Sequence, residues 1–305
     1  MKTSVALCTY NGEKYLRKQL DSILEQTLAV DEIVVCDDQS TDGTLPILNQ
    51  YKESFPHIFK IHVNEKTLRS VKNFEKSISL CENEIIFLCD QDDLWVPEKV
   101  EVILNQFKIS QDLQVIATNA SIINDNEDLQ KVSTIYDIPS KSTKGLTEIL
   151  FFHQNFCTGA TMALRKKFAK SLMPFPPENL YHHDEWIALN ASLNNELLFL
   201  NDQLIKYRIH QNQLVGGVMF SDSDLQKRLD KIDLPVEEMN SKIIFSFLKK
   251  LHRKIADIER FKMIEHQHFF DLMLKELEAK QLKISLVAKR KFKLLTFLYK
   301  LTGKI

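Results

Sequence analysis

Short apolar runs alternate with amphipathic stretches over about the first 120 residues of the chain. Leu16, Leu20 and Ile23 recur at helical spacing, whereas runs such as IIFLC are continuously apolar, as strands buried on both faces are. We predict strands over residues 4–9, 32–36, 58–63, 84–89 and 113–118, and helices over 16–24, 41–51, 71–80 and 97–107. Strands that alternate with helices form βαβ units, so the pattern predicts an α/β fold with a mostly parallel central sheet flanked by helices.

The pattern changes in the second half of the chain. Residues 124–144 are polar and poorly periodic, which predicts an excursion over the surface. Apolar stretches return at residues 149–152, 160–164, 187–193 and 197–205. From about residue 225 the sequence is Lys-rich and helical in pattern, and Pro235 is expected to break it.

Charge divides the chain at a similar place. The net charge is −1, but residues 242–305 hold 16 basic and 6 acidic residues, whereas residues 1–241 hold 24 and 35. We therefore predict two domains, an α/β domain over residues 1–220 and a helical, basic C-terminal region over residues 221–305. A chain of 305 residues that is 44% hydrophobic is long enough for one large core and a smaller appendage.

Cysteine usage and hydropathy indicate where the protein works. The five cysteines are an odd number without a CxxC pair, and Cys8, Cys36 and Cys89 lie in apolar, strand-like runs, which favours a reducing compartment. The N-terminus lacks the pattern of a cleaved signal peptide. No apolar run approaches the ~18 residues that a membrane-spanning helix needs. We expect a cytoplasmic protein.

Acidic and small polar residues follow three of the predicted strands. Thr9, Tyr10 and Asn11 follow the first, Asp38 lies after the second, and residues 90–93 (the DQDD motif) follow the fourth. In an open α/β sheet such positions meet at the ligand-binding edge. Helix capping explains single residues there, but not three acids in four positions, which persist most readily beside a cation. Carboxylates suit Mg²⁺ or Mn²⁺, which take their other ligands from water and substrate phosphates.

Familiar nucleotide-binding signatures are missing from the sequence. It contains neither GxGxxG nor GxxxxGK[ST], which disfavours a Rossmann dehydrogenase or a P-loop kinase. Haloacid-dehalogenase phosphatases also place a DxD after a strand. They place it after the first strand, and here it follows the fourth.

Six segments together resemble family 2 glycosyltransferases, particularly bacterial rhamnosyltransferase-like enzymes. They are TYNGEKYL (9–16), VVCDDQSTDGT (34–44), FLCDQDDLWVPEKV (87–100), CTGATMALR (157–165), HHDEWIA (182–188) and YRIHQN (207–212). The resemblance covers roughly residues 1–217 and implies a nucleotide-diphospho-sugar transferase (GT-A) fold. It also implies a donor site at Thr9, Tyr10, Asn11 and Asp38. Asp90 and Asp92 would then form the metal-binding DxD, with Asp92 as the direct ligand.

The acid of the HHDEW segment would be the general base of an inverting transfer. We favour Asp184, because a carboxylate must take the proton of the acceptor hydroxyl as it attacks the sugar. The family often has an aromatic residue where this chain has Glu185, which leaves a second candidate. The alternative for Asp184 is a helix N-cap. The family also often has Gly near Arg69, whose side chain either contacts the donor or is solvated.

The YRIHQN segment implies a second group of donor contacts. Arg208 and His210 alternate on an extended segment and face one side together. We predict that Arg208 binds the diphosphate and that His210 is a metal ligand; a purely structural His210 is the alternative.

The pattern of residues 283–305 predicts a basic amphipathic helix. Residues 283–304 carry seven Lys and Arg and no acid, and apolar residues recur every three to four positions. Such a helix binds an anionic membrane surface, or packs its apolar face on the main domain or a second subunit in a homodimer. Recognition motifs for nucleic acid are absent.

We therefore expect an inverting, Mg²⁺- or Mn²⁺-dependent glycosyltransferase. It would move rhamnose or another hexose from a UDP- or dTDP-linked donor to a saccharide or lipid-linked acceptor in cell-surface polysaccharide synthesis, at the inner face of the membrane. The alternatives are a Mg²⁺-dependent phosphohydrolase of the haloacid-dehalogenase type and a non-catalytic nucleotide-sugar binding module.

Overall fold

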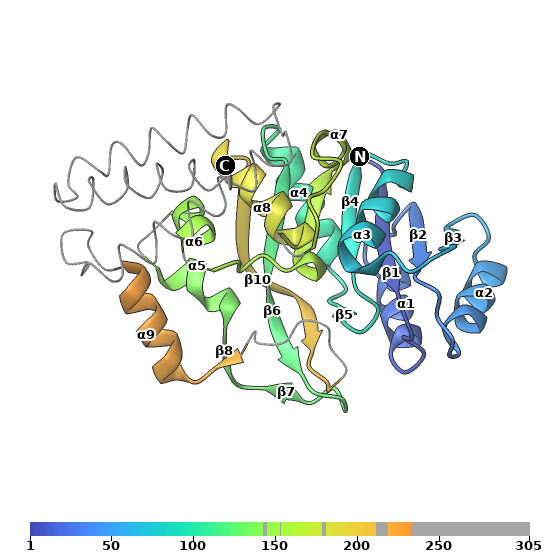
Figure 1. Cartoon of the computed structure of the whole chain (residues 1–305), viewed down its shortest axis with the longest axis horizontal. Coiled ribbons are helices and arrows are strands. Elements are labelled where there is room, and N and C mark those ends of the chain that lie inside the picture. The colour runs from blue at the N-terminus through green and yellow to red at the C-terminus, as the bar shows by residue number, and fades with distance from the viewer. Residues whose placement is uncertain (143–144, 153, 179–180, 212–218, 234–305) are drawn as a thin grey trace, which may run out of the picture. The chain divides into compact units, whose positions relative to one another are not determined.

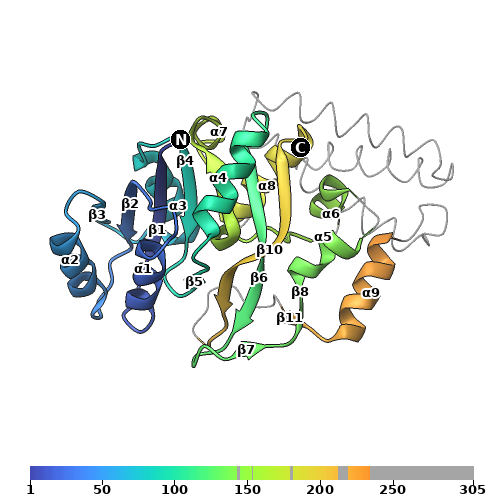
Figure 2. The ribbon, with the colours of Figure 1, turned by 180° about the vertical axis from the view of Figure 1, so that it is seen from behind.

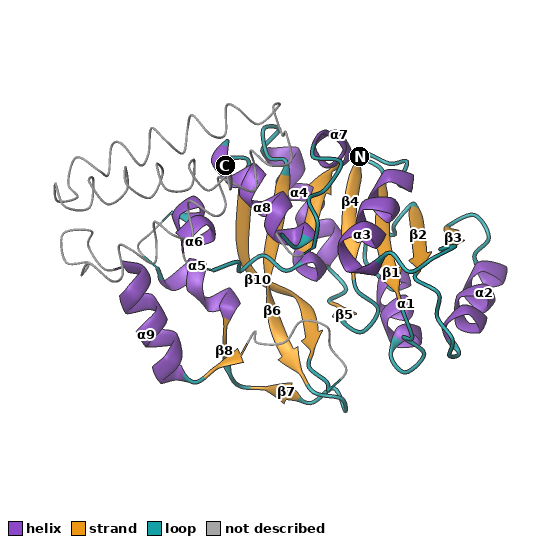
Figure 3. Cartoon of the chain, in the orientation of Figure 1, coloured by secondary structure: helices purple, strands orange, loops and turns teal. Residues whose placement is uncertain are grey.

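A nine-stranded mixed sheet forms the centre of the protein in the computed structural model, which describes residues 1–142, 145–152, 154–178, 181–211 and 219–233 (Figures 1 and 3). Eight of its strands follow the order β3-β2-β1-β4-β9-β6-β10-β5, and β7 pairs with β6. The strands are β1 (Thr3–Thr9), β2 (Glu32–Asp37), β3 (Phe59–Val63), β4 (Ile85–Cys89), β5 (Leu94–Trp95), β6 (Val115–Ile123), β7 (Leu129–Gln130), β9 (Met162–Arg165) and β10 (Leu197–Arg208). A separate two-stranded sheet pairs β8 (Ser133–Thr134) with β11 (Met219–Phe220).

Helices connect the strands of the sheet. They are α1 (Leu16–Leu24), α2 (Thr44–Ser54), α3 (Arg69–Leu80), α4 (Lys99–Ile109), α5 (Ile138–Lys141), α6 (Leu146–Phe152), α7 (Lys166–Ser171), α8 (His183–Leu193) and α9 (Asp222–Asp233), with short 3₁₀ turns η1 (Ile135–Asp137) and η2 (Gly159–Thr161). Every strand and helix predicted for the first 120 residues is present, with ends that differ by a few residues.

The predicted parallel sheet is confirmed for β3, β2, β1 and β4. β9 breaks the pattern, because it pairs antiparallel with both β4 and β6. The chain reaches β9 from the η2 turn rather than through a crossover helix, and antiparallel pairing does not require a crossover. β6 and β10 then resume parallel pairing.

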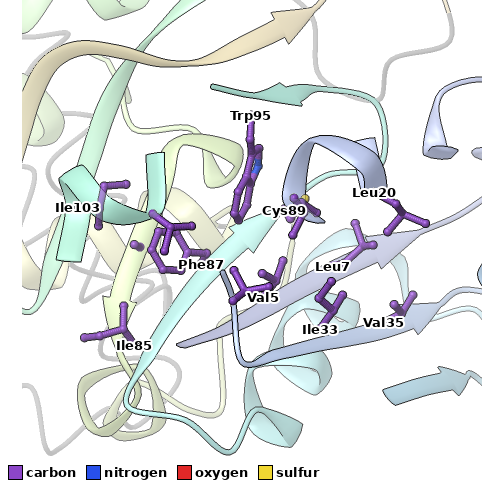
Figure 4. Packing of buried hydrophobic residues seen from close by; sticks show 14 of the residues in the cluster. Val5, Leu7, Leu20, Ile33, Val35, Ile85, Phe87, Cys89, Trp95 and Ile103 are labelled. Atoms are coloured by element: carbon purple, nitrogen blue, oxygen red, sulfur yellow. The ribbon is translucent and has the colours of Figure 1, made fainter. Parts of the chain in front are cut away.

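The main core lies on one face of this sheet. Val5 and Leu7 of β1 point to the same side as Ile33 and Val35 of β2 and Phe87 of β4 (Figure 4). Apolar residues of α1 and α4 pack against them. The alternate residues of β1 and β2 point to the opposite face. There α3 contacts β1 and β2, so helices cover both faces (Figure 2).

The sequence predicts that the polar stretch over residues 124–144 lies at the surface, but part of it is buried. Ile135, Tyr136 and Ile138 are buried, and the Tyr136 hydroxyl shares a hydrogen bond of 2.8 Å with Thr158 Oγ1. The elements here are two to four residues long, too short for a hydrophobic period to be visible.

The chain divides into two compact units. The first comprises Met1–Ser140 and Asn155–Leu225, and the second comprises Lys141–Gln154 and begins again at Gln226. The predicted boundary at residues 220 and 221 stays a prediction. The basic segment over residues 283–305 lies outside the described residues. Within the described part of the chain, no helix has the length and apolar character that crossing a bilayer requires.

Candidate active site

Three loops meet where the parallel strands end. In the ladder of β1 and β2, Thr9 lies opposite Asp37, and Leu7 of β1 lies opposite Cys89 of β4. The loops that follow β1, β2 and β4 therefore emerge at the same edge of the sheet. They carry Tyr10, Asn11, Asp38, Asp90 and Asp92 of the residues predicted for donor and metal binding, as expected for a ligand site in an open α/β sheet.

Gln91 connects the loop after β1 to the DQDD motif. Its Oε1 accepts a hydrogen bond of 2.8 Å from the Tyr10 amide, and its Nε2 donates one of 2.9 Å to the Tyr10 carbonyl. A Cβ at Gly12 would lie 2.5 Å from Gln91 Cδ, so only glycine leaves room for this side chain. The sequence does not predict this role of Gln91, because the acidic residues beside it account for the motif on their own.

The predicted donor residues of the loop after β1 differ in their exposure. Thr9 is buried and its Oγ1 donates to Asp37 Oδ2 at 2.8 Å. Asn11 has a positive φ of 50°, and its Oδ1 accepts from the Thr41 amide at 2.8 Å. Tyr10 is 51% exposed. Thr9 and Asn11 thus fix the backbone, whereas the ring of Tyr10 is accessible to a ligand.

Asp38 holds the segment that leads into α3. Its carboxylate accepts hydrogen bonds from the amides of Leu68 and Arg69, at 2.7 and 2.9 Å, and from Asn64 Nδ2 at 2.7 Å. Arg69 has a φ of 63°, a conformation that glycine adopts without strain. This explains why a glycine suits this position, and Arg69 itself presents an exposed side chain next to the loop.

The DQDD motif concentrates negative charge. Burial, together with the charges of Asp92 and Asp184, raises the pKa of Asp90 to about 7, while Lys99 opposes them. Burial and the charges of Asp92 and Asp90 raise the pKa of Asp93 as well. Asp93 is buried and its Oδ1 accepts a hydrogen bond of 2.9 Å from the Arg208 amide. Asp93 therefore fixes the motif to β10, and Asp90 and Asp92 remain for a ligand.

The structure brings the predicted metal ligands Asp92 and His210 into contact. The His210 Nε2 and the Asp92 Oδ2 are 2.9 Å apart, and the His210 ring lies 4.8 Å from that of Tyr15. Among the described residues, no group of three or more His, Cys, Asp or Glu side chains is arranged as a preformed metal site. The residues fit an ion that takes the rest of its shell from water and a diphosphate, because Asp90 and Asp92 supply hard oxygen ligands and uncompensated charge.

Arg208 lies inside the protein. Its side chain is 0% exposed, its Nε donates to the Asp92 carbonyl at 2.7 Å, and its Nη1 donates to the Asn124 carbonyl at 3.1 Å. The guanidinium also lies 4.8 Å from the centre of the Tyr15 ring. These contacts hold the backbone of the DQDD motif. The predicted contact of Arg208 with a diphosphate stays a prediction, and it would require these groups to move.

Asp184 lies in the first turn of α8. Its Oδ2 accepts a hydrogen bond of 3.2 Å from the Gly159 amide, and its Oδ1 accepts one of 2.6 Å from the Glu185 amide. Burial raises its pKa to about 6, although both amides lower it. Since Asp184 in turn raises the pKa of Asp90, the predicted base and the DQDD motif belong to one electrostatic cluster. Glu185 is partly exposed beside it.

His183 packs behind Asp184. Its ring stacks on Phe74 at 4.0 Å between centroids, and burial lowers its pKa to about 3, so it is neutral. A Cβ at Gly159 would lie 2.6 Å from His183 Nε2. Gly159 therefore lets the turn that binds Asp184 approach α8 closely.

Comparison with known proteins identifies the family. The sequence profile described as glycosyl transferase family 2 matches residues 4–173, which include the three strand-end loops. The chain belongs to this family. It is 28% identical over 188 residues to the chondroitin synthase of Escherichia coli, covering 61% of this chain and 26% of that protein. It is 26% identical over 222 residues to the dTDP-rhamnosyl transferase RfbG of Shigella flexneri, covering 69% of this chain and 74% of that protein.

Solved structures confirm the GT-A fold of this glycosyltransferase. S. aureus TarS 1–349 in complex with UDP has a TM-score of 0.55 at 21% identity, covering 87% of this chain and 74% of that one. The mannosyltransferase PcManGT from Pyrobaculum calidifontis, in complex with GDP-Man and Mn²⁺, has a TM-score of 0.57 at 13% identity, covering 99% and 86%. The chain spans about a quarter of the length of the chondroitin synthase.

Proposed function

We propose that the protein is an inverting, divalent-metal-dependent glycosyltransferase. It moves a sugar, rhamnose or another hexose, from a nucleoside-diphosphate donor to a saccharide or lipid-linked saccharide acceptor. The observation that carries the proposal is the electrostatic cluster at the end of the sheet. Asp90 and Asp92 from the loop after β4 and Asp184 from α8 lie close enough that Asp92 and Asp184 each raise the pKa of Asp90.

The acids of the DQDD motif serve the donor side. A bound Mg²⁺ or Mn²⁺ would neutralise charge that builds on the departing diphosphate. Asp90, Asp92 and His210 are the groups proposed to hold it. Two solved structures of similar fold support a nucleotide donor, since one contains UDP and the other GDP-Man, the latter with Mn²⁺. We expect a UDP- or dTDP-linked sugar as the donor. Its nucleobase would lie beside the exposed Tyr10 ring and the backbone around Asp38.

Asp184 serves the acceptor side. The acceptor oxygen attacks the anomeric carbon, its proton passes to Asp184, and the bond to the diphosphate oxygen breaks with its electron pair. Attack from the face opposite the leaving group inverts the anomeric configuration. Since the pKa of Asp184 is about 6, its carboxylate is ionised at neutral pH and basic enough to accept the proton.

The setting of the reaction rests on the relatives. A chondroitin synthase and a dTDP-rhamnosyl transferase are among the similar proteins, which supports a saccharide acceptor and a role in cell-surface polysaccharide synthesis. We propose that the enzyme works in the cytoplasm and that residues 283–305 attach it to anionic lipid at the inner face of the membrane.

A nucleotide-sugar screen tests the proposal. Nucleoside-diphosphate sugars with Mn²⁺ should raise the melting temperature, since a ligand of the native state stabilises it. Asp92→Ala should abolish the part of this shift that requires Mn²⁺, while leaving the melting temperature without ligand close to that of the parent. Full transfer or donor hydrolysis in excess chelator would contradict the metal dependence. Phosphate release from simple phosphate esters, with no turnover of any nucleotide sugar, would instead favour a phosphohydrolase.

A further inference from the structure

Lys99 is a buried cation that has no role in the proposed donor and acceptor sites. It begins α4 and its side chain is 0% exposed. Its Nζ donates a hydrogen bond of 2.8 Å to the Ala160 carbonyl and lies 4.1 Å from the centre of the Trp95 ring. A lysine is almost never fully buried unless it is paired, because desolvating its ammonium is costly. Packing alone would be served at least as well by an apolar residue.

The hydrogen bond of Lys99 leads directly to Asp184. Ala160 belongs to η2, and the preceding residue of this turn, Gly159, donates its amide to Asp184 Oδ2. Lys99 thus holds the turn at its Ala160 carbonyl, and the turn holds the carboxylate at its Gly159 amide. α4 in turn begins six residues after the end of the DQDD motif, and Lys99 is one of the charges that Asp90 experiences.

We propose that Lys99 is a positioning residue that fixes the η2 turn, and through it Asp184, relative to the DQDD motif. This inference rests on the proposed function, in which Asp184 is the base. Lys99 touches neither donor nor acceptor. It sets where the base stands with respect to the donor site, and a displacement of about 1 Å at a reacting group is enough to cost ~100-fold in rate.

The charge of Lys99 supports this assignment. Burial lowers its pKa to about 8, while Cys89, Asp93 and Asp90 raise it, so the ammonium remains largely charged at neutral pH. A charged donor forms a stronger hydrogen bond to a carbonyl than a neutral one does. Removing it should loosen the turn, and should also leave the DQDD motif more negative and therefore at least as attractive to a cation.

Lys99→Met is the main test, because methionine has a similar length but neither charge nor donor. Turnover is measured as release of nucleoside diphosphate from the nucleotide sugar that gives the largest thermal shift with Mn²⁺. We expect kcat to fall at least tenfold, while the Kd for Mn²⁺ with UDP is unchanged or lower. Lys108→Met, on the exposed part of the same helix, is the matched control and should keep the parent kcat.

A double-mutant cycle with Asp184→Asn separates positioning from a general loss of structure. If Lys99 acts through Asp184, Lys99→Met should have no further effect on kcat once Asp184 is replaced. Losses that multiply in the double variant, or a Lys99→Met enzyme with parent kcat, would overturn the inference. If Lys99→Met does not fold, Lys99→Gln replaces it in the double-mutant cycle, because glutamine is a shorter and neutral hydrogen-bond donor. No turnover by the parent protein would contradict the proposed function itself, and the role of Lys99 with it.

Discussion

At the scale of single residues, Asp184 and Glu185 illustrate how two neighbouring carboxylates acquire different surroundings. Consecutive helical residues point about 100° apart, so the two cannot both face an acceptor. Asp184 points to η2, where it accepts a hydrogen bond from the Gly159 amide. Burial there raises its pKa to about 6, a value that suits the proposed role of general base.

Asp184→Asn should separate chemistry from binding. General bases contribute typically ~10²–10⁴-fold, so we expect kcat for transfer to fall at least about 100-fold. Donor affinity with Mn²⁺, measured by calorimetry, should stay within a few-fold of the parent. Glu185→Gln is the control and should remain active. An inactive Glu185→Gln enzyme beside an active Asp184→Asn enzyme would assign the base to Glu185.

Asp90 leads to a prediction about stability that does not depend on catalysis. Its pKa is raised from 3.8 to about 7, so the folded protein holds this proton more tightly than the unfolded chain does. Ionising Asp90 therefore destabilises the metal-free protein progressively from about pH 4 to about pH 7. Asp90→Asn avoids this, and its free energy of unfolding relative to the parent should rise across that window and level off above it.

Denaturant unfolding in excess EDTA, repeated from pH 4 to pH 8, measures this difference. In excess Mn²⁺ at pH 8 the parent should instead be more stable than Asp90→Asn. The ion stabilises the parent, whereas the variant lacks one of the proposed ligands. A difference that is the same at every pH would mean that Asp90 titrates alike in the folded and unfolded chains.

At the scale of elements, the strand-end loops are held by side chains that bind the backbone of a neighbouring segment. Gln91 fixes the loop after β1, Asp38 fixes the start of α3, and Arg208 fixes the DQDD motif to the loop after β6. Each makes two or more hydrogen bonds to backbone groups. Loops arranged in this way present a ligand with a rigid surface.

Gly12→Ala tests the role of Gln91. The new Cβ would displace the Gln91 side chain and break its two hydrogen bonds to the Tyr10 backbone. We expect a loss of about 0.5–1.5 kcal/mol in the free energy of unfolding, the usual contribution of a hydrogen bond, and weaker donor binding. Gly145→Ala is the matched control, since a Cβ there meets nothing within 4 Å. In a Gln91→Ala background, Gly12→Ala should cost little more; a full additional loss would place the strain elsewhere.

Apart from the two-residue strand β5, the strands and helices before residue 120 could be predicted because each is long enough to show an apolar run or a period. β9 could not, since Met162–Arg165 is short and its direction depends on partners remote in sequence. The contact of Asp92 with His210 could be anticipated from motif order. The roles of Gln91 and Lys99 could not, because a polar residue beside a motif looks the same in sequence whether it is solvated or holds a backbone group.

At the scale of the whole molecule, the basic C-terminal segment gives a prediction about location. Truncation after Gln281 removes residues 282–305 and should release the protein from phosphatidylserine vesicles while leaving donor binding intact. Each basic residue near an anionic surface contributes roughly 1 kcal/mol and is screened by salt. Added salt should therefore weaken cosedimentation of the full chain. Equal sedimentation of both chains would favour a packing or dimer role.

The position of β9 between β4 and β6 has a consequence for the order in which the protein is made. β1, β2, β3 and β4 all lie within the first 89 residues and pair with one another, so this half of the sheet is complete once that part of the chain has left the ribosome. β6 joins them only through β9, which is synthesised later. We expect this half of the sheet to fold first, with the edge of β4 unpaired until β9 is synthesised and connects it to β6.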